Sequence, residues 1–156
     1  MSSGRPILFV VGTPIGNLED ISLRAIRILK EADLIACEDT RKTRLLLNRH
    51  GIPSARLISY HKFNEAKRTE ELLRLFGQGK SVALVCNAGT PGISDPGARL
   101  VQAAVEKGIR VEVVPGPSAI TAALSVSCLA RDEFLFCGFI PSRSATRRKK
   151  FVSMSD

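Results

Sequence analysis

The stretch Asn87-Ala88-Gly89-Thr90-Pro91-Gly92-Ile93-Ser94-Asp95-Pro96-Gly97 decides how the chain folds. The apolar run 82–86 before it is typical of a buried strand, and the apolar residues in 100–105 after it have helical spacing. This order predicts a loop at the carboxyl end of a parallel sheet, where open α/β sheets bind ligands. Its glycines let the backbone approach a ligand, and its prolines stiffen it. The alternative is a plain connector, although such loops usually have only ~2–6 residues.

The composition favours a polyanionic partner. The 156 residues carry a net charge of +8, which indicates nucleic acid ahead of a membrane; a generally basic protein is the alternative. The hydrophobic fraction of 44% is enough for a core. Aromatic residues are sparse and tryptophan is absent, so we do not expect stacking on many bases to dominate recognition.

The four cysteines form no C-x-x-C pair, so the sequence predicts no zinc site and no metal centre. We expect reduced thiols, with Cys37 and Cys86 buried at strand ends. The apolar run 7–11 is too short for a signal peptide, and no run reaches membrane-spanning length. These features predict a cytoplasmic protein without a membrane segment.

Apolar runs and amphipathic stretches alternate through the first 115 residues, after a flexible lead over residues 1–6. The predicted strands are 7–11, 34–37, 56–59, 82–86 and 111–114. This alternation predicts an α/β fold, a three-layer parallel-sheet domain over residues 7–115. Asp20 is the predicted cap of the first helix, which we expect to be buried through Leu23, Ile26, Leu29 and Ala32.

Residues 116–156 are predicted to begin a second, truncated α/β domain. Pro115-Gly116-Pro117 is the expected hinge, followed by a helix over 120–126, a strand over 134–139 and the start of a basic helix. One strand cannot form a sheet, so we expect this part to be incomplete. We therefore expect the first domain to fold without help and residues 1–156 alone to have little or no activity.

Five stretches, taken in order and spacing, resemble the tetrapyrrole (corrin/porphyrin) methylase superfamily, and within it the ribosomal RNA small-subunit methyltransferase I family. They are Pro14-Ile15-Gly16-Asn17-Leu18, Glu38-Asp39-Thr40-Arg41, His61 with Asn64-Glu65, Ala88-Gly89-Thr90-Pro91 through Asp95-Pro96-Gly97, and Pro115-Gly116-Pro117-Ser118-Ala119. The resemblance covers residues 7–150 and implies two α/β domains, S-adenosylmethionine between them and a homodimer. The implied reaction is methylation of a cytidine ribose 2′-hydroxyl in small-subunit ribosomal RNA.

This chain departs from that family in two residues and in its extent. Asn87 and Cys86 stand where the family usually has aspartate and serine. Asparagine still forms hydrogen bonds but cannot act as a base or attract a cation. The family continues through most of a second domain beyond residue 156, which would supply the other wall of the cofactor cleft.

The glycine-rich loop is the predicted cofactor site. The backbone of Ala88, Gly89 and Thr90 suits the amino-acid part of the cofactor, and Ile93 suits its apolar face. The resemblance adds Pro14, Ser118 and Ala119 as lining residues, although Ser118 also fits a helix cap.

Proton removal from a ribose hydroxyl needs a base, and the candidates are Glu38, Asp39 and His61. The alternative for the two carboxylates is pairing with Arg41 or capping of the next helix. For His61, a role outside catalysis is the alternative.

The predicted RNA contacts fall in two groups. Arg143, Arg147, Arg148 and Lys149 form a basic segment suited to phosphates, with a solvated helix face as the alternative. The motifs of the resemblance place Arg41, Asn64, Glu65 and Asp95 on the substrate side. The alternatives to an RNA methyltransferase are a methylase of a tetrapyrrole precursor and a basic RNA-binding fragment without catalysis. In every case we expect Gly12, Glu38, Gly89 and Pro117 near one edge of the sheet.

Overall fold

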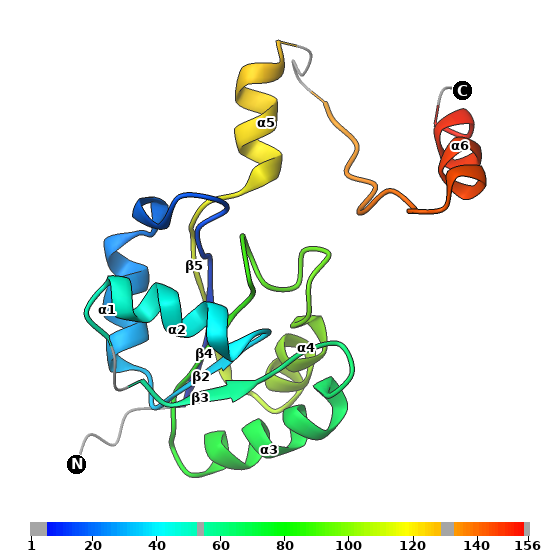
Figure 1. Cartoon of the computed structure of the whole chain (residues 1–156). Coiled ribbons are helices and arrows are strands. Elements are labelled where there is room, and N and C mark those ends of the chain that lie inside the picture. Colours follow the sequence, from blue (N-terminus) through cyan, green and yellow to red (C-terminus); the bar gives the residue numbers. More distant parts are fainter. Residues whose placement is uncertain (1–5, 53–54, 129–132, 155–156) are drawn as a thin grey trace.

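The order of helices and strands follows the predicted alternation. The structure, a computed structural model, describes residues 6–52, 55–128 and 133–154. Its elements are β1 (Ile7–Val11), the 3-10 helix η1 (Leu18–Asp20), α1 (Leu23–Glu31), β2 (Leu34–Cys37), α2 (Thr40–Arg49), β3 (Leu57–Ser59), α3 (Glu65–Gly77), β4 (Val82–Val85), α4 (Ala98–Glu106), β5 (Arg110–Val114), α5 (Ala119–Ser127) and α6 (Ser144–Val152). The five strands predicted up to residue 114 are confirmed (Figure 1).

All five strands pair in parallel, in the order β3-β2-β4-β1-β5. Helices α1 and α2, which follow β1 and β2, pack on one face, whereas α3 and α4, which follow β3 and β4, pack on the other. The chain therefore leaves β4 toward the face opposite to that used by both of its neighbours, β1 and β2. Such reversals open crevices at the carboxyl ends of strands. The glycine-rich loop begins at the end of β4, between two of these crevices.

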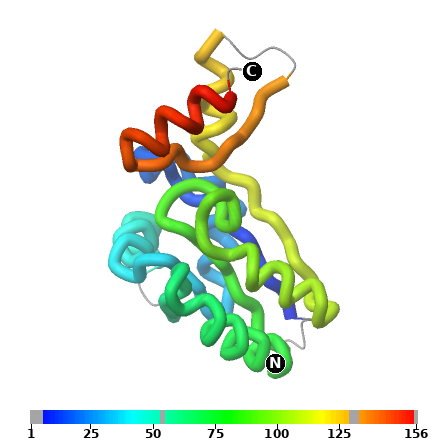
Figure 2. The backbone as a smooth tube through the Cα atoms, turned by 90° about the vertical axis from the view of Figure 1, so that its right-hand side faces the viewer, coloured from blue at the N-terminus to red at the C-terminus, as the bar shows by residue number. Residues whose placement is uncertain are grey.

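Each face of the sheet has its own hydrophobic core. Ile28 and Leu47 contribute to the core beneath α1 and α2, and Leu72 and Leu100 to the core beneath α3 and α4. Strands β2 and β4 are buried on both faces, as expected inside a parallel sheet. This confirms the three-layer arrangement, with helices on both sides of the sheet (Figure 2).

The start of α1 differs from the prediction. Ser22, not Asp20, is the cap, and its hydroxyl accepts the Ala25 N–H at 3.1 Å. Asp20 lies in η1, too early in the chain to reach the first turn of α1. The buried face also shifts, because Ala25 and Ile28 face the core while Leu23 is 85% exposed.

The amino ends of β2 and β4 are joined through Asp33. Its carboxylate accepts the Ser81 N–H at 2.8 Å and the Ser81 hydroxyl at 3.0 Å, and pairs with the Lys80 ammonium at 2.9 Å. The backbone hydrogen bond from Ser81 is the main cause of a lowered pKa for Asp33. This carboxylate therefore fastens the amino edge of the sheet.

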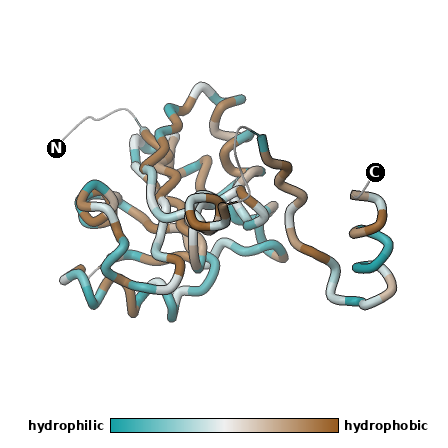
Figure 3. Tube along the Cα trace, turned by 90° about the horizontal axis from the view of Figure 1, so that it is seen from above, coloured by the Kyte–Doolittle hydropathy of each residue, from teal (hydrophilic) through white to brown (hydrophobic). Residues whose placement is uncertain are grey.

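Beyond β5 the chain leaves the sheet through α5, an extended segment over 133–143 and α6 (Figure 1). The prediction of a strand over 134–139 is wrong, because a strand needs a hydrogen-bonded neighbour and no strand lies beside this segment in the part that the structure describes. Figure 3 shows the segment as a hydrophobic stretch, and Phe134 and Phe139 are exposed. The Lys150 ammonium donates to Cys137 O at 2.7 Å, which ties α6 to it.

Candidate active site at the carboxyl end of the sheet

The glycine-rich loop is fastened to the loop that follows β1. Thr13 N–H donates to Gly89 O at 2.9 Å, Gly89 N–H donates to Thr13 O at 3.0 Å, and the Thr13 hydroxyl donates to Cys86 O at 3.2 Å. Gly12 N–H in turn donates to Val114 O at 3.0 Å. The loops after β1, β4 and β5 therefore meet at one edge of the sheet, which confirms the shared edge predicted for Gly12 and Gly89.

The backbone of this loop has positive φ at all three of its glycines, Gly89, Gly92 and Gly97. Gly89 has φ +83°, and Gly97 has φ +139°. A Cβ at position 97 would also lie 2.9 Å from Leu84 Cδ2. Ser94 adopts φ +58° without being glycine, a conformation that costs about 1–2 kcal/mol. Strain of this kind clusters at ligand sites, so the loop is a candidate functional site.

Glu65, predicted on the substrate side, contacts the loop from within the protein. Its carboxylate accepts the Gly97 N–H at 3.0 Å. Because Gly97 immediately precedes α4, this bond satisfies an N–H at the start of that helix. The contact gives Glu65 a role in shaping the loop, and RNA binding by Glu65 stays a prediction.

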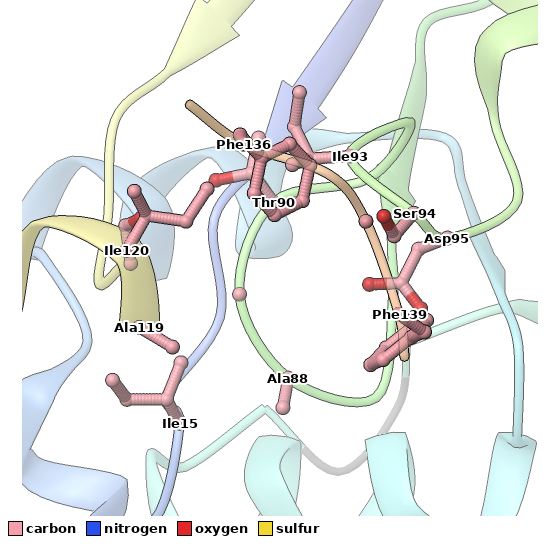
Figure 4. A pocket seen from close by; sticks show the side chains of 13 residues that line it. Ile15, Ala88, Thr90, Ile93, Ser94, Asp95, Ala119, Ile120, Phe136 and Phe139 are labelled. Atoms are coloured by element: carbon pink, nitrogen blue, oxygen red, sulfur yellow. The ribbon is translucent and has the colours of Figure 1, made fainter. Parts of the chain in front are cut away.

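An apolar pocket of about 400 Å³ lies over the loop (Figure 4). Its lining residues are Ile15, Ala88, Gly89, Thr90, Ile93, Ser94, Asp95, Ser118, Ala119, Ile120, Phe136, Gly138 and Phe139. Figure 4 shows Ile15, Ala119 and Ile120 on one side and Ser94, Asp95 and Phe139 on the other.

The apolar pocket brings together six of the seven residues predicted to line a cofactor site. The exception is Pro14, which lines a separate pocket of about 220 Å³ beside Lys42 and Asn87. Sequence reasoning missed Phe136 and Phe139, because their run was assigned to a strand. Sequence reasoning also missed Ile15 and Ile120. Each of them is next to a predicted residue in the sequence, and this position was the available signal.

An acidic pocket of about 590 Å³ adjoins the first. It brings together Glu38, Asp39 and His61, the three candidate bases, although they come from two different loops. The other lining residues are Lys62, Phe63, Asn87, Ser94, Asp95, Pro96 and Phe139. Ser94, Asp95 and Phe139 therefore belong to the walls of both pockets.

Asp95, in the glycine-rich loop, and Cys86, at the end of β4, both have raised pKa values. Burial and the nearby charge of Glu38 raise the pKa of the Asp95 carboxyl. Burial, followed by the charge of Asp95, raises the pKa of the Cys86 thiol to about 12. Cys86 thus stays a thiol at neutral pH, and Asp95 binds a proton more readily than an ordinary aspartate.

Asp39 caps the next helix and pairs with Arg41, as in the alternative to a catalytic role. Its carboxylate accepts the Arg41 N–H at 2.9 Å at the start of α2 and pairs with the Arg41 guanidinium at 2.9 Å. These two hydrogen bonds from Arg41 lower the pKa of Asp39 to about 2. The Arg41 side chain is otherwise exposed at the rim, so its contact with RNA stays a prediction.

Asn64 holds His61 in place. Its amide oxygen accepts the His61 N–H at 2.8 Å, and its amide nitrogen donates to Ser59 O at 3.2 Å. The amide nitrogen also lies 3.1 Å from His61 Nε2, and the Phe63 N–H lies 3.3 Å from His61 Nδ1. Both ring nitrogens of His61 therefore have a hydrogen-bonding neighbour.

Asn87 leaves one hydrogen-bond acceptor without a partner. Its Oδ1 is the one buried side-chain oxygen or nitrogen without a partner among the described residues. Its backbone N–H lies 3.4 Å from the Glu38 carboxylate. An unsatisfied buried acceptor costs about 1–3 kcal/mol, so this end of the sheet is not optimised for stability.

The predicted basic segment forms α6 and its cap. Arg143 precedes the helix, and Arg147, Arg148 and Lys149 lie within it with exposed side chains. Lys150 and Arg147 both donate to the backbone of the preceding segment, to Cys137 O at 2.7 Å and to Ser142 O at 3.2 Å. Over the described ranges, no cluster of three or more His, Cys, Asp or Glu residues could hold a metal ion. No helix among these residues is long and apolar enough to cross a membrane.

Residues 8–147 match the profile of the Tetrapyrrole (Corrin/Porphyrin) Methylases. The chain belongs to this family. The match confirms the superfamily that the sequence motifs resemble, and the parallel sheet confirms its fold.

Individual relatives show what this methylase family member is similar to. It is 50% identical over 147 residues to ribosomal RNA small subunit methyltransferase I of Thermotoga maritima, covering 94% of this chain and 65% of that protein. It is also 50% identical to the protein of that name from Escherichia coli O157:H7, covering 90% and 49%. The crystal structure of uroporphyrin-III-C-methyltransferase from Thermus thermophilus aligns with a TM-score of 0.58 and 28% identity, covering 80% and 52%. The chain thus spans only about half to two thirds of the length of these relatives.

Proposed function

We propose that the chain is part of an S-adenosylmethionine-dependent methyltransferase that modifies a cytidine ribose 2′-hydroxyl of small-subunit ribosomal RNA. The observation that carries this proposal is the adjoining pair of pockets at the carboxyl edge of the sheet, one apolar and one acidic. Methyl transfer needs a methyl donor and a nucleophile side by side, each in its own surroundings. The names of the relatives support RNA as the substrate.

The apolar pocket fits S-adenosylmethionine, which supplies a methyl group on a sulfonium when it is bound. Its volume of about 400 Å³ lies within the usual range for ligand sites. The backbone of residues 88–90 would hold the polar amino-acid part, and Ile93 the apolar part. Ser118 and Ala119 would close the opposite wall.

The residues of the acidic pocket would orient the ribose and hold the proton that leaves its hydroxyl. Glu38, Asp39 and His61 are the candidates that the sequence suggested, and Asp95 lies among them. A positioned base of this kind accelerates proton transfer by about 100-fold to 10,000-fold.

The cations of α6 would bind phosphates of the RNA without reading its sequence. Arg147, Arg148 and Lys149 are exposed on one short helix, which suits a phosphate backbone. We include a homodimer and a cytoplasmic location in the proposal, because the resemblance implies the first and ribosomal substrates imply the second.

The proposal is tested with two proteins. One is the chain itself, and the other is a chimera in which residues 1–156 replace the matching part of the Thermotoga maritima relative. Both are titrated with S-adenosylmethionine by calorimetry. Both are then incubated with radiolabelled S-adenosylmethionine and either small ribosomal subunits or uroporphyrinogen III.

We expect the chimera to bind the methyl donor and to label ribosomal RNA, and the chain alone to label it weakly or not at all. The 28% identical uroporphyrin methyltransferase favours a second candidate, a tetrapyrrole methylase. Labelling of uroporphyrinogen III without RNA would decide for that candidate. RNA binding without methyl transfer by the chimera would instead indicate a non-catalytic RNA-binding protein.

A further inference from the structure

We propose that the loop over residues 61–64, between β3 and α3, binds a single-stranded segment of the substrate RNA (Figure 1). The Phe63 ring stacks on one nucleobase, and the Lys62 ammonium binds the adjoining phosphate. Aromatic rings and cations hold unpaired RNA in this way in other proteins. The inference rests on the proposed function for the class of substrate and adds two residues that hold it.

Phe63 is exposed at a place where an aromatic ring can contact the substrate. It is 93% exposed, whereas Tyr60, three positions earlier, is 1% exposed. A single exposed apolar residue is common on protein surfaces, so exposure alone says little. Phe63 also lines the acidic pocket at the carboxyl end of the sheet. A base stacked on this ring would remove apolar surface from water at the edge of the candidate site.

Hydrogen bonds hold the backbone on both sides of Phe63. The His61 N–H donates to the Asn64 amide oxygen at 2.8 Å, and the Asn64 backbone N–H donates to His61 O at 2.9 Å. The rings of His61 and Phe63 meet edge to face, with their centroids 6.1 Å apart. Glu65, the next residue, accepts the Gly97 N–H. A ring on a turn held in this way loses little freedom when it stacks, so the loop is preorganised for a base.

The charges of the acidic pocket favour different parts of an RNA strand at different places. Glu38, Asp39 and Asp95 line the pocket, and their carboxylates repel phosphates. Hydroxyls and base edges therefore suit the interior, and phosphates suit the rim. Lys62 is the one lysine or arginine among the described residues that line this pocket, and it is exposed. Residues 62 and 63 thus offer a phosphate site and a base site side by side.

The same charges favour RNA over a tetrapyrrole precursor. Uroporphyrinogen III carries carboxylates around the whole edge of its ring, so stacking on Phe63 would bring some of them toward Glu38 and Asp95. An RNA strand carries its charge on the backbone alone, which can pass Lys62 while one base lies on the Phe63 ring. The proposal therefore commits to RNA.

The first test measures binding of single-stranded oligocytidylate to the chimera at several salt concentrations. It compares Phe63→Ala and Lys62→Gln with Leu23→Ala. Leu23 is 85% exposed at the start of α1 and is not among the residues of the acidic pocket, so it is a matched loss of an exposed apolar side chain.

We expect Phe63→Ala to weaken binding by about 5-fold to 100-fold without changing the log–log salt slope, because a stacked ring neutralises no phosphate. Lys62→Gln should lower that slope by about 0.7. Leu23→Ala should change neither quantity. Equal affinities of Phe63→Ala and Leu23→Ala would overturn the proposal.

The second test needs no activity. The chain contains no tryptophan, so Phe63→Trp introduces a single one into residues 1–156. Oligocytidylate should quench its fluorescence, and an abasic ribose-phosphate strand of the same charge should not. Equal quenching by the abasic strand would show that no base stacks there. Quenching by uroporphyrinogen III without quenching by oligocytidylate would assign the loop to a tetrapyrrole. Either result overturns the proposal.

The third test separates RNA binding from an indirect effect through His61, whose ring meets Phe63. In the chimera, Phe63→Ala should raise KM for small ribosomal subunits and leave kcat unchanged, and Phe63→Trp should restore KM. The thermal midpoint of residues 1–156 should not change. A fall in kcat at unchanged KM, or a lower midpoint, would give Phe63 a structural role and overturn the proposal.

Two further results separate this inference from the proposed function. If the chimera methylates ribosomal RNA while Phe63→Ala keeps the wild-type KM, the assignment of Phe63 fails and the proposed function stands. If the chimera transfers no methyl group but oligocytidylate quenches Phe63→Trp and the abasic strand does not, the proposed function fails and the RNA-binding loop stands.

Discussion

The two ends of one sheet carry aspartates in opposite circumstances. At the amino end, Asp33 accepts hydrogen bonds from Ser81 and pairs with Lys80, and its pKa is lowered. At the carboxyl end, Asp95 is partly buried near Glu38, and its pKa is raised. The charged form of Asp33 is therefore favoured at the amino end of the sheet. The charged form of Asp95 is disfavoured at the carboxyl end, where the candidate site lies.

This difference has opposite consequences for the pH dependence of stability. The contribution of Asp33 is present above its unfolded pKa of about 3.9 and is lost as the pH falls through its lowered folded value. The contribution of Asp95 is present below the unfolded pKa and is lost as the pH rises through its raised folded value. The unpaired Asn87 oxygen and the left-handed Ser94 backbone lie at the same end as Asp95.

The largest effect is expected from a paired glycine experiment. Gly89 at the carboxyl end and Gly79 at the amino end have φ of +83° and +75°, so valine strains both similarly. Only Gly89 lines the apolar pocket. In the chimera, Gly89→Val should abolish measurable S-adenosylmethionine binding in calorimetry, while Gly79→Val should keep it. Both should lose about 1–2 kcal/mol of stability. Full affinity in Gly89→Val would exclude the loop as the cofactor site.

A second effect concerns RNA. Replacement of Arg147, Arg148 and Lys149 by glutamine should weaken binding of the chimera to ribosomal RNA. It should also lower the log–log salt slope by about 0.7 for each RNA phosphate that the helix no longer neutralises. The control replaces Lys30, Arg74 and Lys107, which lie at the carboxyl ends of helices, toward the amino end of the sheet. If both triple variants had the same log–log salt slope in filter-binding titrations, the cations of α6 would form only a solvated helix face.

The smallest effect is expected at the amino end. Asp33→Ala should lower the free energy of unfolding at neutral pH by about 1 kcal/mol, measured by urea titration, and the loss should vanish below the lowered pKa of Asp33. Glu31→Ala removes an exposed i,i+4 pair with Arg27 and should cost at most about 0.5 kcal/mol. An equal loss in both variants would mean that Asp33 does not fasten β2 to β4.

The sequence predicts much of this arrangement because its strongest signals are local. Strands such as β2 and β4 are short runs of apolar residues buried on both faces, and helices fill the intervals between strands. The carboxyl ends of parallel strands share an edge, so the meeting of Gly12 with Gly89 followed from the fold class alone. Six predicted cofactor residues line one pocket for the same reason.

The features that escaped prediction depend on distant partners. The run over 134–139 has the composition of a strand, but no neighbouring strand pairs with it among the residues that the structure describes. Glu65 contacts Gly97, 32 positions further along the chain, and no local pattern indicates that contact. The same holds for Asp95, whose significance depends on the two pockets that meet at its side chain.

The most direct test of the contrast between the two ends is a titration of the carboxyl carbons of Asp33 and Asp95 by NMR in the isolated chain. We expect Asp33 to titrate below the ordinary aspartate pKa of about 3.9 and Asp95 to titrate above it. Replacement of Glu38 by glutamine should lower the pKa of Asp95 and leave that of Asp33 unchanged. A pKa for Asp95 at or below that of Asp33 would refute the contrast between the two ends of the sheet.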